Sequence, residues 1–184
     1  MELPENYQWI LDTLTTLSEK DEIKKVLEIG PGRMPFYRFL SDKGYEVHAI
    51  DGKKNNFFGN DTRVHEGQIE FLEDVFGQTK FDAIVASRVF SVQAQNDYRI
   101  PNPARYAQVA IAMAIDPSAR REVEDSLLSL EKEMLASCFG QLRKGGYLII
   151  KEDDWERVLF SESMAASTGF GIIEYSPSNV ILQK

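Results

Sequence analysis

Several kinds of residue are scarce in this sequence, and each scarcity excludes a class of protein. Cys138 is the only cysteine, so no disulfide can form within the chain, and a reducing, cytoplasmic environment is expected. The longest nearly apolar run, residues 109–115, is too short to cross a bilayer. The first residues also lack the basic and apolar regions of a signal peptide, so no membrane anchor is expected.

Basic residues are in the minority as well, with 21 Lys and Arg against 29 Asp and Glu, for a formal net charge of -8. Such a surplus of negative charge disfavours binding to phosphate backbones and anionic lipid headgroups. The basic residues occur at most in short clusters such as Lys24 and Lys25, which do not form a nucleic-acid-binding stripe. The His, Cys, Asp and Glu residues show no grouping with the spacing of a metal site. A small-molecule substrate is therefore the expected partner, with neither nucleic acid nor membrane.

The chain has enough apolar residues for one core, since 43% of its 184 residues are hydrophobic, and we expect one domain over residues 1–184. Apolar periodicity predicts helices at residues 5–19, within a leading segment 1–22, and at 35–43, 117–142 and about 155–167. It predicts strands at residues 25–29, 45–51, 63–66, 81–86, 147–150, 170–175 and 180–183. The alternation predicts an α/β fold with a doubly wound, mostly parallel, seven-stranded Rossmann-like sheet. The link at 176–178 is too short for a parallel crossover, so the last strand is expected to be antiparallel.

In such a sheet the ligand site lies at the carboxyl ends of the strands. Gly30 and Gly32 follow the first strand and permit the close approach of a ligand to the main chain, although they also suit an ordinary tight turn. Glu28, near the end of the same apolar strand, is costly to bury without a partner. That partner could be a cationic or amine-bearing ligand, or a local basic side chain such as Arg33.

Asp51 ends the second strand, 21 residues after Gly30, at about the distance where an acid accepts from ribose hydroxyls. The alternative is a plain turn residue at the end of a strand. A dinucleotide site would have a third glycine three residues after Gly32, but Pro35 stands there. Nicotinamide or flavin binding is therefore disfavoured.

The segments VLEIGPG, AID, EGQIEFL, FDAIVAS and LRKGGYLII, taken in order, resemble the motifs of the class I S-adenosylmethionine-dependent methyltransferases. The likeness runs from about residue 25 to the end of the chain. It implies that Glu28, Gly30 and Gly32 hold the methionine part of S-adenosylmethionine, and that Asp51 binds the ribose.

The same resemblance implies further cofactor contacts. Gln68 and Ile69 correspond to the residues around adenine, with Gln68 where an acid is usual, and Ala86 and Ser87 correspond to residues near the cofactor. The sequence departs from the family pattern at Met34, which replaces its third glycine, and in the run KKNNFFGN after the second strand.

Methyl transfer from a sulfonium depends mainly on proximity and orientation, so a missing catalytic signature does not exclude it. Candidate bases follow the fifth strand at Glu152, Asp153 and Asp154. The interpretation we favour for these three is a solvated acidic loop that caps the next helix. His48 and His65 are interpreted as packed or surface histidines rather than catalytic ones.

Residues 88–116 form an insertion or lid after the fourth strand. Its polar and aromatic side chains could form the acceptor pocket, and they are Arg88, Tyr98, Arg99 and Tyr106. The small apolar helix expected near residues 107–115 could instead bury against a second copy, which makes a homodimer an alternative.

The sequence therefore predicts an S-adenosylmethionine-dependent methyltransferase with an unidentified, small-molecule acceptor. One alternative is a catalytically silent domain of this fold that serves as a binding or scaffold subunit. A second alternative is a nicotinamide-dependent oxidoreductase, which would share the glycine turn and the ribose acid.

Overall fold

The computed structural model describes residues 3–31, 36–52, 60–90, 117–152, 160–176 and 178–184. Of residues 117–127, only Ser118 and Asp125 have described side chains. The elements before residue 90 are α1 (Glu5–Ser18), β1 (Lys25–Ile29), α2 (Phe36–Asp42), β2 (Glu46–Asp51), β3 (Val64–Glu66), the 3-10 helix η1 (Ile69–Phe71), α3 (Leu72–Phe76) and β4 (Phe81–Ser87). Those after residue 116 are α6 (Pro117–Gln141), β5 (Leu142–Lys151), α7 (Glu162–Thr168), β6 (Gly171–Tyr175) and β7 (Asn179–Gln183).

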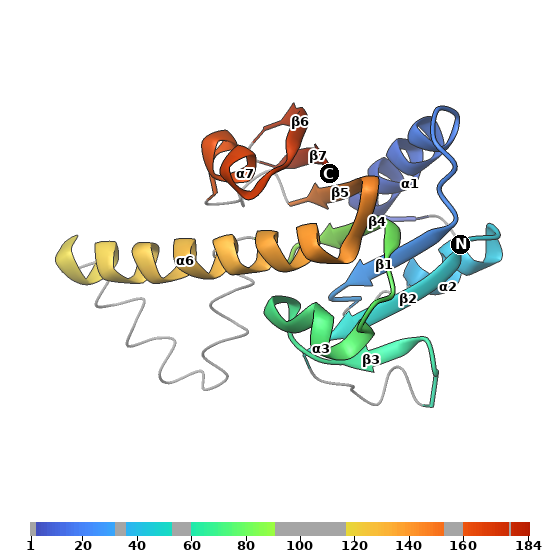
Figure 1. Cartoon of the computed structure of the whole chain (residues 1–184), viewed down its shortest axis with the longest axis horizontal. Coiled ribbons are helices and arrows are strands. Elements are labelled where there is room, and N and C mark those ends of the chain that lie inside the picture. The colour runs from blue at the N-terminus through green and yellow to red at the C-terminus, as the bar shows by residue number, and fades with distance from the viewer. Residues whose placement is uncertain (1–2, 32–35, 53–59, 91–116, 153–159, 177) are drawn as a thin grey trace.

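The strands form one seven-stranded sheet in the order β3-β2-β1-β4-β5-β7-β6. The first five strands run parallel to one another, and β7 lies antiparallel between β5 and β6 (Figure 1). The predicted mostly parallel sheet with an antiparallel last strand is confirmed. All five parallel strands therefore end at the same edge of the sheet, where the sequence predicts the ligand site.

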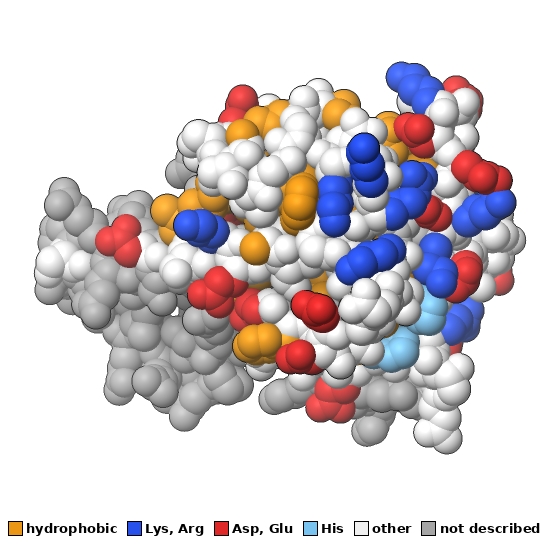
Figure 2. Space-filling view, in the orientation of Figure 1, with side chains coloured by type: hydrophobic (Ala, Val, Ile, Leu, Met, Phe, Trp, Pro, Cys, Tyr) orange, Lys and Arg blue, Asp and Glu red, His pale blue; other side chains and the backbone are white. Residues whose placement is uncertain are grey.

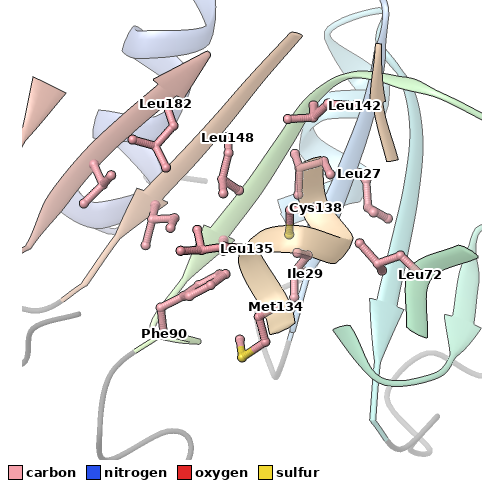
Figure 3. Close-up of a cluster of buried hydrophobic side chains, with 14 of the residues drawn as sticks. Leu27, Ile29, Leu72, Phe90, Met134, Leu135, Cys138, Leu142, Leu148 and Leu182 are labelled. Atoms are coloured by element: carbon pink, nitrogen blue, oxygen red, sulfur yellow. The ribbon is translucent and has the colours of Figure 1, made fainter. Parts of the chain in front are cut away.

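Helices cover both faces of the sheet. Buried side chains of α1 and α2 pack on one face, and those of α3, α6 and α7 pack on the other (Figure 1). β4 lies in the middle of the sheet and is buried on both sides, with Ala83 and Val85 on the α1 side and Ile84 and Ala86 on the α6 side. Figure 3 shows the core between the sheet and α6, in which Met134, Leu135 and Cys138 of α6 point toward the strands.

Cys138 is fully buried, as its place on the apolar face of the long helix predicts. Leu130, Met134 and Leu135 lie on the same buried face, whereas the side chains of Val123 and Leu127 lie outside the described residues. In the part of the chain that the structure describes, no helix is both long and apolar enough to span a membrane.

The junction between α6 and β5 differs from the prediction. The sequence predicts a helix to residue 142 and a strand over 147–150, but α6 ends at Gln141 and β5 starts at Leu142. Leu142 pairs with Phe81, and the register between the two strands then shifts before Ala83. Gly145, with φ of +77°, and Gly146, packed against the Asp82 carbonyl, supply the irregular backbone of this bulge. Both glycines therefore lie within β5, in the segment that the sequence analysis left between the helix and the strand.

The two histidines are partners rather than isolated residues. His48 of β2 and His65 of β3 are both half-buried, and His48 Nδ1 lies 3.2 Å from His65 Nε2. They lie side by side on the face seen in Figure 2 and pack against the rings of Phe76 and Phe81. Of the packed or surface positions predicted for these histidines, the structure shows packed ones. Burial, and then the positive charge of Lys25, lower the pKa of His48, with a smaller opposing effect from Glu46.

We predict that His48→Phe makes the stability less sensitive to acid. A histidine with a depressed pKa in the folded state binds a proton more readily when unfolded, so its contribution to stability is present above about pH 6.5 and is lost below it. Phenylalanine would fit among Phe76 and Phe81 without titrating. Urea unfolding at pH 7.5 and pH 5.5 should show a smaller loss for the variant than for the wild type. Equal losses would contradict the interpretation.

Candidate functional site

The carboxyl edge of the sheet brings the predicted cofactor residues into one row. Strand pairing sets Ile29, just before Gly30, beside Ile50 on one side and Ala86 on the other. Asp51 ends β2 opposite Glu66 of β3. The described residues of the predicted site all belong to this edge, and they are Glu28, Gly30, Asp51, Gln68, Ile69, Ala86 and Ser87. Gly32, with Arg33 and Met34, lies outside the described residues.

Glu28 is a carboxylate inside the core, with only 2% of its surface exposed. Its Oε2 accepts a 2.6 Å hydrogen bond from the main-chain N–H of Tyr37 in the first turn of α2. Burial raises the pKa of Glu28 well above its usual value, and the negative charge of Asp51 raises it further, while the Tyr37 N–H opposes the shift. The carboxylate thus ties the start of α2 to β1 and would be stabilised as an anion by a nearby positive charge.

Gly30 has the backbone conformation that its prediction requires, with φ of +64°. Its N–H donates to the Ile50 carbonyl at 2.8 Å, so the first residue of the turn is still hydrogen-bonded to β2. A Cβ at this position would lie 2.8 Å from Cγ2 of Val89, the second residue after β4. The turn after β1 and the chain after β4 therefore meet closely at Gly30, and only a residue without a side chain fits between them.

The chain after β3 continues this edge. The Gly67 N–H donates to the Asp51 carbonyl at 3.0 Å, which joins the ends of β3 and β2. Gln68 is exposed and Ile69 is half-buried against the α6-side core. An exposed amide beside a partly buried aliphatic side chain can offer a hydrogen bond and an apolar surface to a flat ring.

At the end of β4, the first turn of α1 joins the site. Ala86 is fully buried in the core, whereas the Ser87 hydroxyl accepts a 2.6 Å hydrogen bond from Nδ2 of Asn6. Tyr7, the next residue of α1, lies near Ser87 as well. Burial raises the pKa of Tyr7, the Glu28 charge raises it further, and Arg88 opposes the shift. The Tyr7 hydroxyl consequently lies within the electrostatic reach of Glu28 and Arg88.

Sequence reasoning missed Asn6 and Tyr7, because helical periodicity marks only the buried stripe of α1. The order of the elements could have found them. A short connection joins the end of α1 to the start of β1, and α1 packs on the sheet, so the start of α1 lies at the edge where β1 ends.

The interpretation of Glu152 as part of a solvated acidic loop is wrong. This carboxylate follows β5 directly and is fully buried, and its Oε1 accepts the N–H groups of Val89 and Phe90 at 3.1 and 2.8 Å. β5 and β4 end side by side in the sheet. Glu152, the first residue after β5, therefore lies against the chain that follows β4 and is buried there. Asp153 and Asp154 lie outside the described residues.

Only the beginning of the predicted lid is described. Arg88 is exposed and has φ of +59°, and its N–H donates to the Lys151 carbonyl at 3.0 Å. Tyr98, Arg99, Tyr106 and the expected helix at 107–115 lie outside the described residues, so the acceptor pocket and the homodimer stay predictions.

No model of a known protein family matches the sequence, and no curated protein matches it. Solved structures match the fold at low identity. An amino pentose methyltransferase from Micromonospora echinaspora aligns with a TM-score of 0.57 at 9% identity, over 98% of this chain and 91% of that one. An N-methyltransferase from Bradyrhizobium japonicum WM9 aligns with a TM-score of 0.54 at 12% identity, over 97% and 95%.

A protein from Galdieria sulphuraria, assigned as a sarcosine dimethylglycine methyltransferase, aligns with a TM-score of 0.55 at 15% identity. The alignment covers 91% of this chain but 62% of that protein, so the chain spans less than two thirds of its length. The chain has the fold of the class I S-adenosylmethionine-dependent methyltransferases.

We predict that Gly30→Ala destabilises the protein by about 2 kcal/mol or more, because it adds a clash with Val89 to the roughly 1–2 kcal/mol cost of a left-handed backbone. Gly44→Ala is the matched control, since Gly44 has φ of +95° but no atom within 4 Å of the added Cβ. Chemical denaturation should show the larger loss at Gly30, and Val89→Ala should recover part of it. Equal losses at both glycines would contradict the close contact.

Proposed function

We propose that this chain is an S-adenosylmethionine-dependent methyltransferase that acts on a small-molecule acceptor. The observation that carries the proposal is the pair of carboxylates, Glu28 and Asp51, at neighbouring strand ends beside the left-handed turn at Gly30. The proposal also draws on the fold, which this chain shares with an amino pentose methyltransferase and with a protein assigned as a sarcosine dimethylglycine methyltransferase.

The chemistry of these groups fits the cofactor. S-adenosylmethionine carries a sulfonium and an ammonium group, and Glu28 and Asp51 are two negative charges close enough to disfavour each other. A cation between or beside them would relieve that repulsion. Gly30, without a side chain, would let the methionine part approach the main chain, and Asp51 would accept from the ribose hydroxyls.

Gln68 and Ile69 would hold the adenine. The Gln68 amide oxygen can accept from the exocyclic amine, and Ile69 would pack against the ring. Ala86 and Ser87 would line the pocket from β4, and Gly32 would complete the turn after β1. These assignments depend on the resemblance in sequence together with the shared edge of the sheet.

Bound S-adenosylmethionine would supply an electrophilic methyl group to an acceptor atom, and S-adenosylhomocysteine would leave. The protein would contribute mainly by position, because well-oriented reactants need little further assistance. Ser87 and Tyr7 are polar residues at this edge of the sheet, near the end of β1 that carries Glu28. Their hydroxyl groups could orient an acceptor. We assign no general base.

The nicotinamide-dependent alternative is not supported by the sheet. Dinucleotide-binding folds have the strand order 3-2-1-4-5-6 in a parallel sheet, whereas β7 is inserted antiparallel before β6 in this chain. A silent binding subunit would share the cofactor site, and it would be recognised by cofactor affinity without turnover.

We predict that the protein binds S-adenosylmethionine and S-adenosylhomocysteine but not NADH in calorimetric titration. Glu28→Gln and Asp51→Asn should each weaken binding by about 10- to 100-fold, which corresponds to the roughly 1.5–3 kcal/mol of a hydrogen bond to a charged group. Glu46→Gln is the matched control, because Glu46 is an exposed carboxylate at the opposite end of β2. No binding of either sulfur compound at millimolar concentration by the folded protein would overturn the proposal.

We also predict that Glu28→Gln stabilises the ligand-free protein near neutral pH. A carboxyl group with a raised pKa contributes to stability below its unfolded pKa, near 4.3, and that contribution is lost as the pH rises through the folded pKa. Glutamine keeps an oxygen for the Tyr37 N–H but carries no charge to bury. Thermal melts should place the variant above the wild type at pH 7, with a smaller difference at pH 4. A variant that melts lower at pH 7 would contradict this account.

A further inference from the structure

Another buried carboxylate, Glu152, lies two strands away from Glu28 and has no part in the proposed cofactor contacts. It is fully buried and follows the last residue of β5, where its own N–H donates to the Ser178 carbonyl at 2.8 Å. A carboxylate is costly to bury unless hydrogen bonds satisfy it. The groups that it binds therefore indicate what it is for.

Both described donors to Glu152 belong to the chain that leaves β4. Oε1 accepts from the N–H of Val89 at 3.1 Å and from the N–H of Phe90 at 2.8 Å. The residue before them, Arg88, is the only non-glycine residue with positive φ in the described part of the chain. A left-handed residue with a side chain persists only where its surroundings hold it. Glu152 stabilises this conformation, because it accepts hydrogen bonds from the N–H groups of the two residues after Arg88.

The two residues that Glu152 holds point to different places. Phe90 is fully buried and lies in the core beneath α6, near Leu135 and Met134 (Figure 3), with its ring 6.1 Å from that of Phe160. Val89 lies over Gly30, with Cγ2 2.8 Å from the position that a Cβ would occupy. Glu152, at the end of β5, therefore holds Val89 in place, and Val89 in turn limits the space above the Gly30 turn.

Glu28 and Glu152 play parallel roles on the two strands that flank β4. Each is buried at the carboxyl end of its strand, and each accepts main-chain N–H groups of a segment that borders the site. Glu28 binds the Tyr37 N–H at the start of α2, and Glu152 binds the chain after β4. They differ in that Glu152 reaches Gly30 only through Val89.

We propose that Glu152 is a positioning residue, whose carboxylate holds Val89 and Phe90 and thereby sets the shape of the ligand site above Gly30. This inference depends on the proposed function only where it concerns the cofactor. It requires an acceptor oxygen at position 152 rather than a titrating group, so glutamine should replace glutamate and alanine should not.

The first test needs no ligand. In the wild-type protein, the amide hydrogens of Val89 and Phe90 should exchange slowly although they follow the end of β4, because Glu152 accepts both. Glu152→Gln should keep most of this protection, and Glu152→Ala should raise both exchange rates at least about tenfold. Rapid exchange of these amides in the wild type would overturn the proposal, even if the alanine variant failed to fold.

The second test is the calorimetric affinity for S-adenosylhomocysteine. Glu152→Gln should bind within about threefold of the wild type, and Glu152→Ala at least about tenfold more weakly. Gln141→Ala is the matched control, because Gln141 is also buried and holds main-chain groups, the Gly77 and Thr79 carbonyls, near the other end of β4. It should lower stability without changing the affinity or the exchange of Val89 and Phe90.

The outcomes separate the two proposals. If no variant and no wild type binds S-adenosylhomocysteine, but amide exchange still separates alanine from glutamine, then the proposed function fails and the role of Glu152 in holding the chain stands. If the alanine variant keeps wild-type affinity and amide protection, the positioning role is wrong. It is also wrong if the glutamine variant loses both as fully as the alanine variant does.

Discussion

β1 and β4 are buried on both faces of the sheet, and this burial places the helices and the polar residues around them. Their side chains are apolar almost throughout, so helices must cover each side of the sheet, and polar groups are displaced to the strand ends. Because the first five strands are parallel, all their carboxyl ends share one edge. Gly30, Asp51 and Ser87 gather there although they are far apart in the sequence.

The exceptions to apolar burial are as informative as the rule. Glu28 and Glu152 are carboxylates buried at the carboxyl ends of the strands that flank β4, and each accepts at least one hydrogen bond from a main-chain N–H group. Burial disfavours the anionic forms of both groups. Both hold segments that border one edge of the sheet, and a ligand site with a fixed shape requires such segments.

The first turn of α1 shows how an element outside the expected motifs enters the site. Asn6 and Ser87 are 81 positions apart, yet they form a 2.6 Å hydrogen bond, and Tyr7 lies close enough to Glu28 for its charge to matter. The leading helix is therefore more than a cover for the sheet. It contributes polar side chains to the edge where the acceptor is proposed to bind.

Local sequence patterns were enough to predict the α/β class, the mostly parallel sheet and the places of Glu28, Gly30 and Asp51 at strand ends, because apolar periodicity and glycine turns encode strands, helices and their ends. Three further features became visible only in the folded chain, where long-range contacts form. The tertiary structure moved the start of β5 to Leu142, since the bulge opposite Phe81 accommodates Gly145 and Gly146 within the strand. It buried Glu152 against Val89 and Phe90, and it brought Asn6 to Ser87. These contacts join residues more than 60 positions apart, and no local pattern records which strand ends will lie side by side.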